Sequence, residues 1–101
     1  MPQEFLSVAI WEPVPGMEAQ SLATMRELSA LIFQKGYGRD LLHRSADSQY
    51  LLLRYWNSEE ARKAALEDPD LLRCWARLGN EIHILTVYET LERINTEQKN
   101  T

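Results

Sequence analysis

The chain has 101 residues, of which 45% are hydrophobic and 26% charged, and its formal net charge is −4. This size and balance predict one globular domain. Without a run of Lys or Arg the chain lacks the clustered positive charge that nucleic acids and anionic membranes attract, so we expect neither as a partner. Cys74 is the only cysteine, which excludes an internal disulfide and a cysteine metal cluster and favours a reducing, cytoplasmic location.

No segment is expected to target or cross a membrane. The apolar stretches are far shorter than the roughly 20 residues that span a bilayer. Residues 1–4 carry no basic side chain and lead straight into a predicted strand, which is not the pattern of a signal peptide.

The chain begins with a predicted strand and a predicted helix. An apolar run indicates the strand over 4–11. Residues that disfavour a strand then follow, namely Pro13, Pro15 and Gly16. Apolar residues at three- and four-residue spacing predict a helix over 17–35, and Gly36 stands where a left-handed C-cap is expected.

A hairpin comes next. We predict a strand over 37–44, a turn over 45–48 and a further strand that ends at Trp56. Either Asn57 or Ser58 is the N-cap of the helix that follows, since Asn57 has Glu three residues later and Ser58 competes for the same role.

A broken helix and a last strand complete the chain. The helix ends near residue 67, because the proline of Asp68-Pro69 restarts a helix easily but cannot lie inside one. A short helix over 69–78 and a strand over 81–89 follow. The order β-α-β-β-α-β predicts an α+β, ferredoxin-like antiparallel sheet with its helices on one face.

The predicted strands are apolar on both faces. Side chains alternate between the two faces of a strand, and the stretches 5–11, 50–56 and 82–88 are apolar at both parities. An antiparallel sheet with one face in water shows alternating apolar and polar residues instead. Because the helices of so short a chain cover one face only, we expect the other face to pack against a second copy in a homodimer.

Several features together resemble a known family. They are Pro15-Gly16 before the first helix, the stretch 55–61 (Tyr-Trp-Asn-Ser-Glu-Glu-Ala), Asp68-Pro69 followed by Trp75, and the stretch 87–89 (Val-Tyr-Glu). In these features the chain resembles the antibiotic biosynthesis monooxygenase (ABM) family of dimeric α/β barrels.

The resemblance covers about residues 4–92, and we place one ABM-like domain at 1–94 and a polar C-terminal tail at 95–101. It implies a homodimer in which two sheets pack face to face, and a small-molecule cavity between each sheet and its own helices. Family members include cofactor-independent monooxygenases acting on phenolic polycycles or quinols, haem-degrading enzymes, and proteins with no known reaction.

The resemblance also bears on cofactors. The haem-degrading branch uses an Asn, a Trp and a His, and the matching positions here hold Ala9, Ala65 and Trp75. Neither alanine nor tryptophan ligates iron, so we do not expect haem degradation. We expect no bound metal or flavin.

Oxygenation without a cofactor requires a base, a group that stabilises an anion, and a dry pocket. His83, in line with Leu85 and Val87, is the candidate base, and its alternative role is a buried histidine bonded to backbone or across the dimer. Arg54, the one charge in an apolar strand, is the candidate anion stabiliser; the alternative is an ion pair with Glu89 or Asp40.

Five further residues are candidates for substrate binding. If the first strand presents its odd-numbered residues to the helices, Trp11 and Trp75 form walls, and Ser7 and Ala9 leave room for a ligand. The alternative is that the tryptophans fill the core and the small residues permit close helix packing. His43 is a weaker polar candidate on the second strand, which we expect at a sheet edge.

Three functions remain open from the sequence. The first is an ABM-like oxygenase acting on a small aromatic or quinol substrate. The second is a non-catalytic small-molecule binder, because fold does not dictate function. The third is a structural dimer, which predicts a filled core in place of a cavity.

Overall fold

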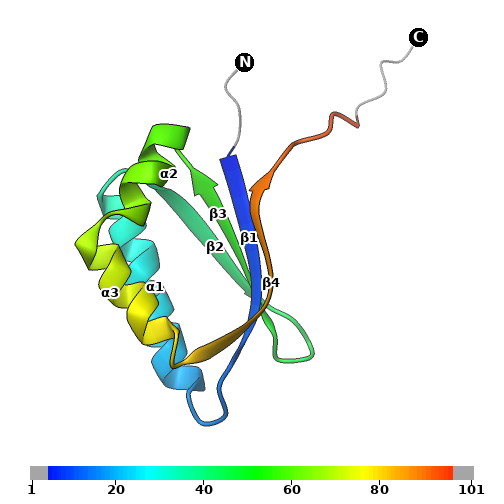
Figure 1. The fold of residues 1–101 in the computed structure, drawn as a ribbon. Helices are drawn as coiled ribbons and strands as arrows, with labels where there is room; N and C mark the ends of the chain where they lie inside the picture. The colour runs from blue at the N-terminus through cyan, green and yellow to red at the C-terminus, as the bar shows by residue number, and fades with distance from the viewer. Residues whose placement is uncertain (1–4, 97–101) are drawn as a thin grey trace.

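Four antiparallel strands form one sheet in the order β2-β3-β1-β4, so that β2 and β4 are its edges (Figure 1). The computed structural model describes residues 5–96. The strands are β1 (Phe5–Pro13), β2 (Gly38–Arg44), β3 (Tyr50–Trp56) and β4 (Ile82–Leu91). Residues 1–4 and 97–101 lie outside the described residues. These include Glu4 of the predicted first strand, the N-terminal segment that we did not expect to be a signal peptide, and most of the predicted tail.

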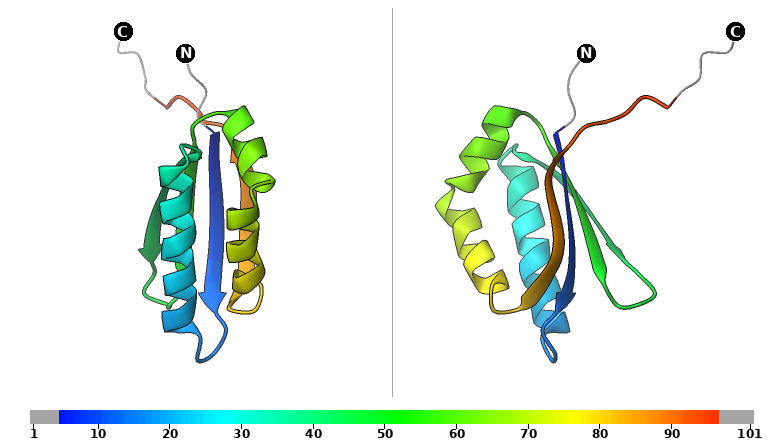
Figure 2. Two further views of the ribbon diagram at one scale, coloured as in Figure 1. Left: turned by 90° about the vertical axis from the view of Figure 1, so that its left-hand side faces the viewer. Right: turned by 45° about the vertical axis from the view of Figure 1, so that its right-hand side comes forward.

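Three helices lie on the same face of this sheet, with α1 beside the α2–α3 pair (Figure 2). They are α1 (Glu18–Gln34), α2 (Glu59–Leu66) and α3 (Pro69–Leu78). The predicted ferredoxin-like order with a broken second helix is therefore confirmed. None of the helices within residues 5–96 has the length and apolar character needed to cross a membrane.

Side-chain caps fix where the two short helices begin. The Ser58 hydroxyl accepts a hydrogen bond from the Ala61 N–H at 2.9 Å, so Ser58 is the N-cap of α2. Asn57 has another role, since its side-chain amide donates to the Gly36 carbonyl at 2.7 Å. Asp68 caps α3 by accepting from the Asp70 N–H at 2.8 Å.

Strand β1 extends to Pro13, two residues beyond its predicted end. Pro13 pairs with Ile82, and the Val14 N–H then donates to the Glu81 carbonyl at 2.9 Å. Proline has no N–H to donate, but here it occupies the last position of the strand, so the ladder loses a donor only at its end.

The core lies between the helices and the sheet. The side chains that fill it are buried and apolar, and they come from α1, α3 and the helix-facing positions of the strands: Trp11, Met25, Leu28, Ile32, Leu52, Leu71 and Leu78 among others. The helix-facing residues of β3 are buried at every second position, from Tyr50 to Trp56, as alternation requires.

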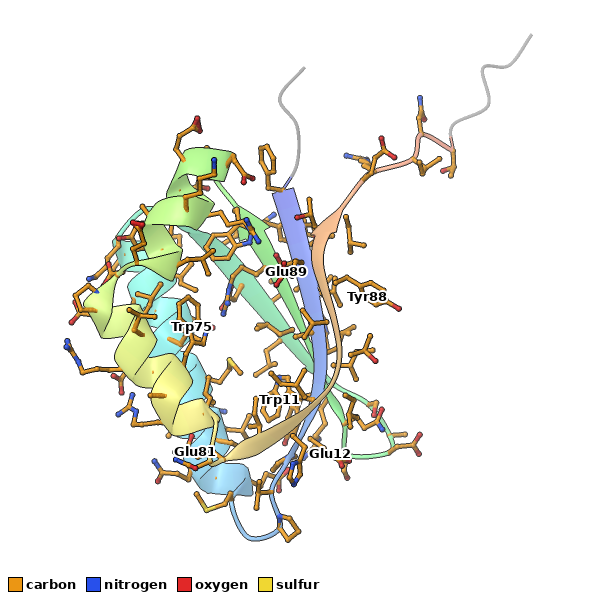
Figure 3. The ribbon with its side chains drawn as sticks, in the orientation of Figure 1. Trp11, Glu12, Trp75, Glu81, Tyr88 and Glu89 are labelled. Atoms are coloured by element: carbon orange, nitrogen blue, oxygen red, sulfur yellow. The ribbon has the colours of Figure 1, made fainter. Side chains whose placement is uncertain are left out.

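No described helix covers the opposite face of the sheet, which we call the open face. Tyr88 points away from the helices in Figure 3, and it pairs with Val8. The register places further apolar side chains with it, namely Leu6, Val8, Ile10, Leu41, Leu51 and Leu53. Leu41 is 42% exposed and Tyr88 52% exposed in the single chain.

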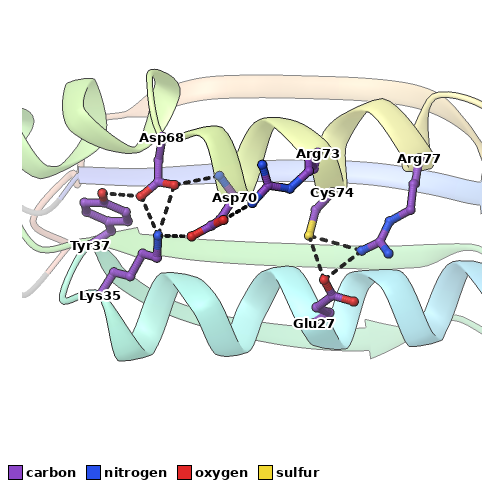
Figure 4. Close-up of polar contacts among 8 residues, drawn as sticks. All are labelled: Glu27, Lys35, Tyr37, Asp68, Asp70, Arg73, Cys74 and Arg77. Carbon is purple, nitrogen blue, oxygen red and sulfur yellow. Dashed lines mark hydrogen bonds and ion pairs between the residues drawn. The ribbon is translucent and has the colours of Figure 1, made fainter.

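A polar network joins the C-terminal end of α1 to the α2–α3 junction (Figure 4). The Lys35 ammonium lies 2.9 Å from Asp68 and 2.5 Å from Asp70, and the Tyr37 hydroxyl donates to Asp68 at 2.6 Å. The hydrogen bonds from Tyr37 and Lys35 lower the pKa of Asp68 from 3.8 to about 2. The network fixes the break between α2 and α3 over the sheet.

Asp68→Asn should weaken the fold at neutral pH and have little effect in strong acid. A depressed folded pKa contributes stability above the unfolded value of 3.8, and this contribution is lost as pH falls toward about 2. Asparagine is itself a good N-cap, so the variant removes charge and leaves capping in place. The measurement is the thermal midpoint of wild type and variant between about pH 6 and about pH 2.

Asp47→Asn, in the exposed turn between β2 and β3, is the matched control and should follow the wild-type curve. A midpoint difference for Asp68→Asn that stayed constant across this pH range would contradict the assignment.

Candidate ligand cavity and active site

Strand alternation decides which side chains face the helices. In β1 these are Ser7, Ala9 and Trp11, which pair with Arg54, Leu52 and Tyr50 of β3. The Trp11 ring stacks on Tyr50 with centroids 4.5 Å apart, which fixes its position in the sheet. The short side chains of Ser7 and Ala9 leave the space above them unfilled.

A cavity of about 510 Å³ lies between sheet and helices, and we call it the large chamber. This volume is in the range of ligand sites in proteins. Its walls are mostly apolar and include Ala9, Trp11, Met25, Leu52, Trp75 and Ile82, with Arg54 as the charged member. Figure 3 shows Trp75 on α3 and Trp11 on β1 on opposite sides of this region.

A second cavity of about 220 Å³, the small chamber, adjoins the first. The two share Ala9, Leu52, Arg54 and Trp75. The small chamber adds polar residues, namely Ser7, Arg62 and Glu89. Arg54 therefore lies where an apolar space meets a polar one.

The chambers are accessible from the side of β4. Ile84 is 60% exposed and Val87 is 48% exposed, although both lie on the helix-facing side of the sheet and line the chambers. Their exposure follows from the arrangement of the helices, which pack mainly on one another and on β2 and β3. The chambers are thus open to solvent along β4 in the single chain.

Arg54 is held by a buried ion pair. Its Nε and Nη2 donate to the two Asp40 oxygens at 2.7 and 2.8 Å, and the Ser29 hydroxyl donates to the same carboxylate at 2.5 Å. The side chains of Arg54 and Asp40 are 9% and 2% exposed. Asp40, one of the two partners considered from the sequence, is the partner found, and no hydrogen bond joins Arg54 Nη1 to another described residue.

The hydroxyl of Ser7 is already engaged. It donates to the Glu89 carbonyl at 2.5 Å and accepts from the Trp56 indole N–H at 2.9 Å. Ser7 thus fixes β1 against β4 and Trp56, and it has no further proton to donate to a ligand.

The two histidines lie away from the chambers. His83 pairs with Glu12 and His43 pairs with Leu51, both on the open face. The expected alignment of His83 with Val87 is wrong, because the register of β4 shifts between Trp11–Ile84 and Ile10–Thr86. This β-bulge turns Val87 to the cavity side while His83 stays on the other. The structure does not bring His83 or His43 together with Arg54.

Sequence reasoning missed Arg62 and the unpaired state of three buried polar atoms. Arg62 lines the small chamber, and no sequence pattern singled it out. Within the described residues, Trp11 Nε1, Thr24 Oγ1 and Glu81 Oε1 are buried without a hydrogen-bond partner, a feature that no sequence pattern signals. Trp11 lines the large chamber, but its indole N–H is itself buried.

Other reactive groups are not arranged for catalysis. Cys74 is buried, and burial raises the pKa of its thiol, with Arg77 at 3.4 Å and Glu27 at 3.6 Å from the sulfur (Figure 4). No group of three or more His, Cys, Asp or Glu within residues 5–96 is placed to hold a metal ion.

Known proteins were compared with the chain by sequence and by structure. No protein-family model and no curated protein matches the sequence. Among solved structures, SnoaB from Streptomyces nogalater, a cofactor-independent oxygenase, matches with a TM-score of 0.74 at 21% identity, covering 95% of this chain and 100% of its own.

Two further matches are proteins assigned as antibiotic biosynthesis monooxygenases. The one from Chloroflexus aurantiacus has a TM-score of 0.74 at 15% identity and covers 96% of this chain and 99% of its own. The one from Bacteroides thetaiotaomicron has a TM-score of 0.78 at 10% identity and covers 97% of each chain.

The chain is thus an α+β protein with a ferredoxin-like sheet and a cavity under its helices. More particularly, its fold is the ABM-type fold, as the resemblance in sequence indicated.

Arg54→Leu should destabilise the fold by about 3–5 kcal/mol, because it leaves the Asp40 carboxylate buried without its cation. The double variant Arg54→Leu/Asp40→Leu removes both charges and should recover most of that loss. Urea unfolding of the two variants and the wild type measures the difference. Equal destabilisation of the single and double variants would show that the pair is not the cause.

Proposed function

We propose that the protein is a cofactor-independent monooxygenase-like enzyme that oxidises a small aromatic or quinol substrate in its large chamber. The observation that carries the proposal is an apolar cavity with tryptophan walls and one buried guanidinium, Arg54, on its border. The ABM-type fold supports it, and the cofactor-independent oxygenase SnoaB shares that fold.

The reaction requires the protein to bind the substrate and to stabilise negative charge. In such an oxidation of an activated methylene, the carbon loses two hydrogens and gains one oxygen of O₂, and the second oxygen leaves as water. The substrate supplies the electrons once it has lost a proton and become an electron-rich anion. Arg54 then stabilises the negative charge, and the apolar walls limit the access of water.

The proton need not pass to a histidine. His83 and His43 both lie on the open face, so a general-base role for either has no geometric support within one subunit. Anthrones and quinols are weak acids whose ionisation a nearby cation favours, and the proton can pass to solvent at the exposed edge along β4 while the apolar walls keep water from the rest of the substrate. We therefore place the catalytic contribution of this chain at Arg54.

The cavity also bears on the alternative functions. A purely structural domain predicts a filled core, whereas the large chamber has a volume of about 510 Å³. A non-catalytic binder of the same aromatic class would use the same walls and would differ only in the absence of turnover.

Oxygen uptake in the presence of anthrone or a naphthoquinol tests the reaction. We expect Arg54→Lys to lower turnover by about a hundredfold, the usual effect of losing an oriented donor to a developing anion. His83→Ala should change turnover less than twofold, because its pairing with Glu12 places His83 on the open face.

A cavity-filling pair of variants separates turnover in the chamber from background oxidation. Ala9→Phe places a ring where the two chambers meet and should strongly lower uptake, whereas Ala23→Phe makes the same change on the exposed surface of α1 and should leave it intact. No enhancement of uptake by the wild type, with ligand binding retained, would favour the non-catalytic binder.

We also infer that the functional unit is a homodimer formed through the open face. Leucine, isoleucine and valine side chains dominate this face, and no described helix covers it. Two such faces packed together would remove from water an apolar surface that a single chain leaves half exposed. Glu12 and His83 would then lie at the dimer interface, which corresponds to the alternative role considered for His83.

Val8→Glu should abolish dimerisation, because a carboxylate would be buried in the centre of the open face. Sedimentation equilibrium of the wild type at micromolar concentration should give twice the chain mass, and the variant should give a monomer or lose its fold. Ala23→Glu on the exposed face of α1 is the control and should stay dimeric. A compact wild-type monomer would contradict the inference regardless of how the variant behaves.

A further inference from the structure

The small chamber contains two guanidinium groups, Arg54 from β3 and Arg62 from α2. Charged side chains on a helix usually lie in solvent, yet the Arg62 side chain is only 19% exposed. How tightly each guanidinium is held by its acidic neighbours decides whether it can also bind a ligand.

The acidic neighbours of Arg62 are held loosely. Glu59 Oε1 lies 3.5 Å and Glu89 Oε2 lies 3.6 Å from its guanidinium, both longer than the usual N–H···O hydrogen bond of about 2.7–3.2 Å. Glu89 is 76% exposed, so water screens its charge and its side chain can turn outward. Arg62 thus has hydrogen-bonding capacity that its protein partners do not use.

Arg54 has similar spare capacity. Asp40 occupies its Nε and Nη2, and this bidentate pair fixes the plane of the guanidinium. Nη1 makes no hydrogen bond to another described residue, and Arg54 lines both chambers. A ligand oxygen can accept from Nη1 without breaking the pair with Asp40.

From these contacts we propose that the small chamber is an anion subsite that binds the carboxylate of a ligand through Arg62 and Arg54, while the apolar aromatic body of that ligand occupies the large chamber. The proposal rests on the ligand cavity of the proposed function and adds the substrate class, an aromatic carboxylic acid. The four shared lining residues make the two spaces contiguous, so one molecule can reach both.

The geometry favours an anion over a neutral polar group. A guanidinium presents paired N–H donors that match the two oxygens of a carboxylate, whereas an alcohol can satisfy only one of them. Ser7 has no proton left to donate, so selectivity falls to the two arginines. Glu89 lies on the helix side of β4 (Figure 3) and competes with the ligand for Arg62.

Quenching of intrinsic tryptophan fluorescence measures binding without any turnover. The probes are 2-naphthoate and its neutral counterpart 2-naphthalenemethanol, which share the aromatic body and differ in charge. We expect the wild type to bind the carboxylate about tenfold more tightly than the alcohol, as charge-assisted hydrogen bonds predict. This preference should decrease as salt is added.

Three variants assign the preference to Arg62. Arg62→Gln should bring the two affinities within about twofold by weakening carboxylate binding and leaving alcohol binding unchanged. Glu89→Gln removes the competing anion and should strengthen carboxylate binding severalfold. Lys63→Gln removes a positive charge from the next, exposed residue of α2 and should leave both affinities as in the wild type.

The outcomes separate this subsite from the proposed function. Equal affinity of the wild type for both probes, or a preference unchanged in Arg62→Gln, would overturn the subsite and leave the cavity and its oxidation chemistry standing. Absence of saturable binding of either probe would overturn both the subsite and the ligand cavity. A preference for the carboxylate without oxygen uptake would support the subsite and contradict the proposed monooxygenase activity.

Discussion

The two central strands, β1 and β3, send large side chains to both of their faces, and the rest of the molecule depends on this division. One set, with Trp11, Leu52 and Trp56, meets the helices; the other, with Val8 and Leu53, forms the open face. Since the helices within residues 5–96 cover one face alone, the same alternation that creates the core also leaves an apolar surface without a covering layer. Core, cavity and proposed dimer are consequences of one pattern.

Within the core, a single pair of charges sets what the cavity can do. Asp40 holds Arg54 in a fixed plane below the surface, which costs desolvation that only close pairing offsets. The pair keeps a cation on the border of an apolar space without leaving it uncompensated. Ser29 of α1 donates to Asp40, the Arg54 guanidinium lies over the Trp56 ring, and the Trp56 N–H donates to Ser7. These contacts orient the guanidinium in the absence of any ligand.

The order of elements and most of their bounds were predictable, because apolar spacing, prolines and caps are local signals that the chain carries residue by residue. The Arg54–Asp40 pair was predictable as one of two alternatives, since a charge in an apolar strand requires a partner. The position of His83 was not, because a β-bulge adds a residue that alternation along one strand cannot reveal. Arg62 was missed for a related reason. The sequence gives the positions of the charges on a helix, but how deeply each side chain is buried depends on how the helix packs against the sheet.

The shift in β4 decides which of its side chains a bound molecule would meet. Had pairing continued without interruption through Leu85, Thr86 and Tyr88 would point under the helices, and Val87 and Glu89 would lie outside. Because of one additional residue in β4, Val87 and Glu89 lie along the rim of the cavity in place of Thr86 and Tyr88. The rim therefore carries an aliphatic group and a carboxylate instead of a hydroxyl and a phenol. Insertion or deletion at this point would let related proteins change their chemical preference while every other strand kept its neighbours.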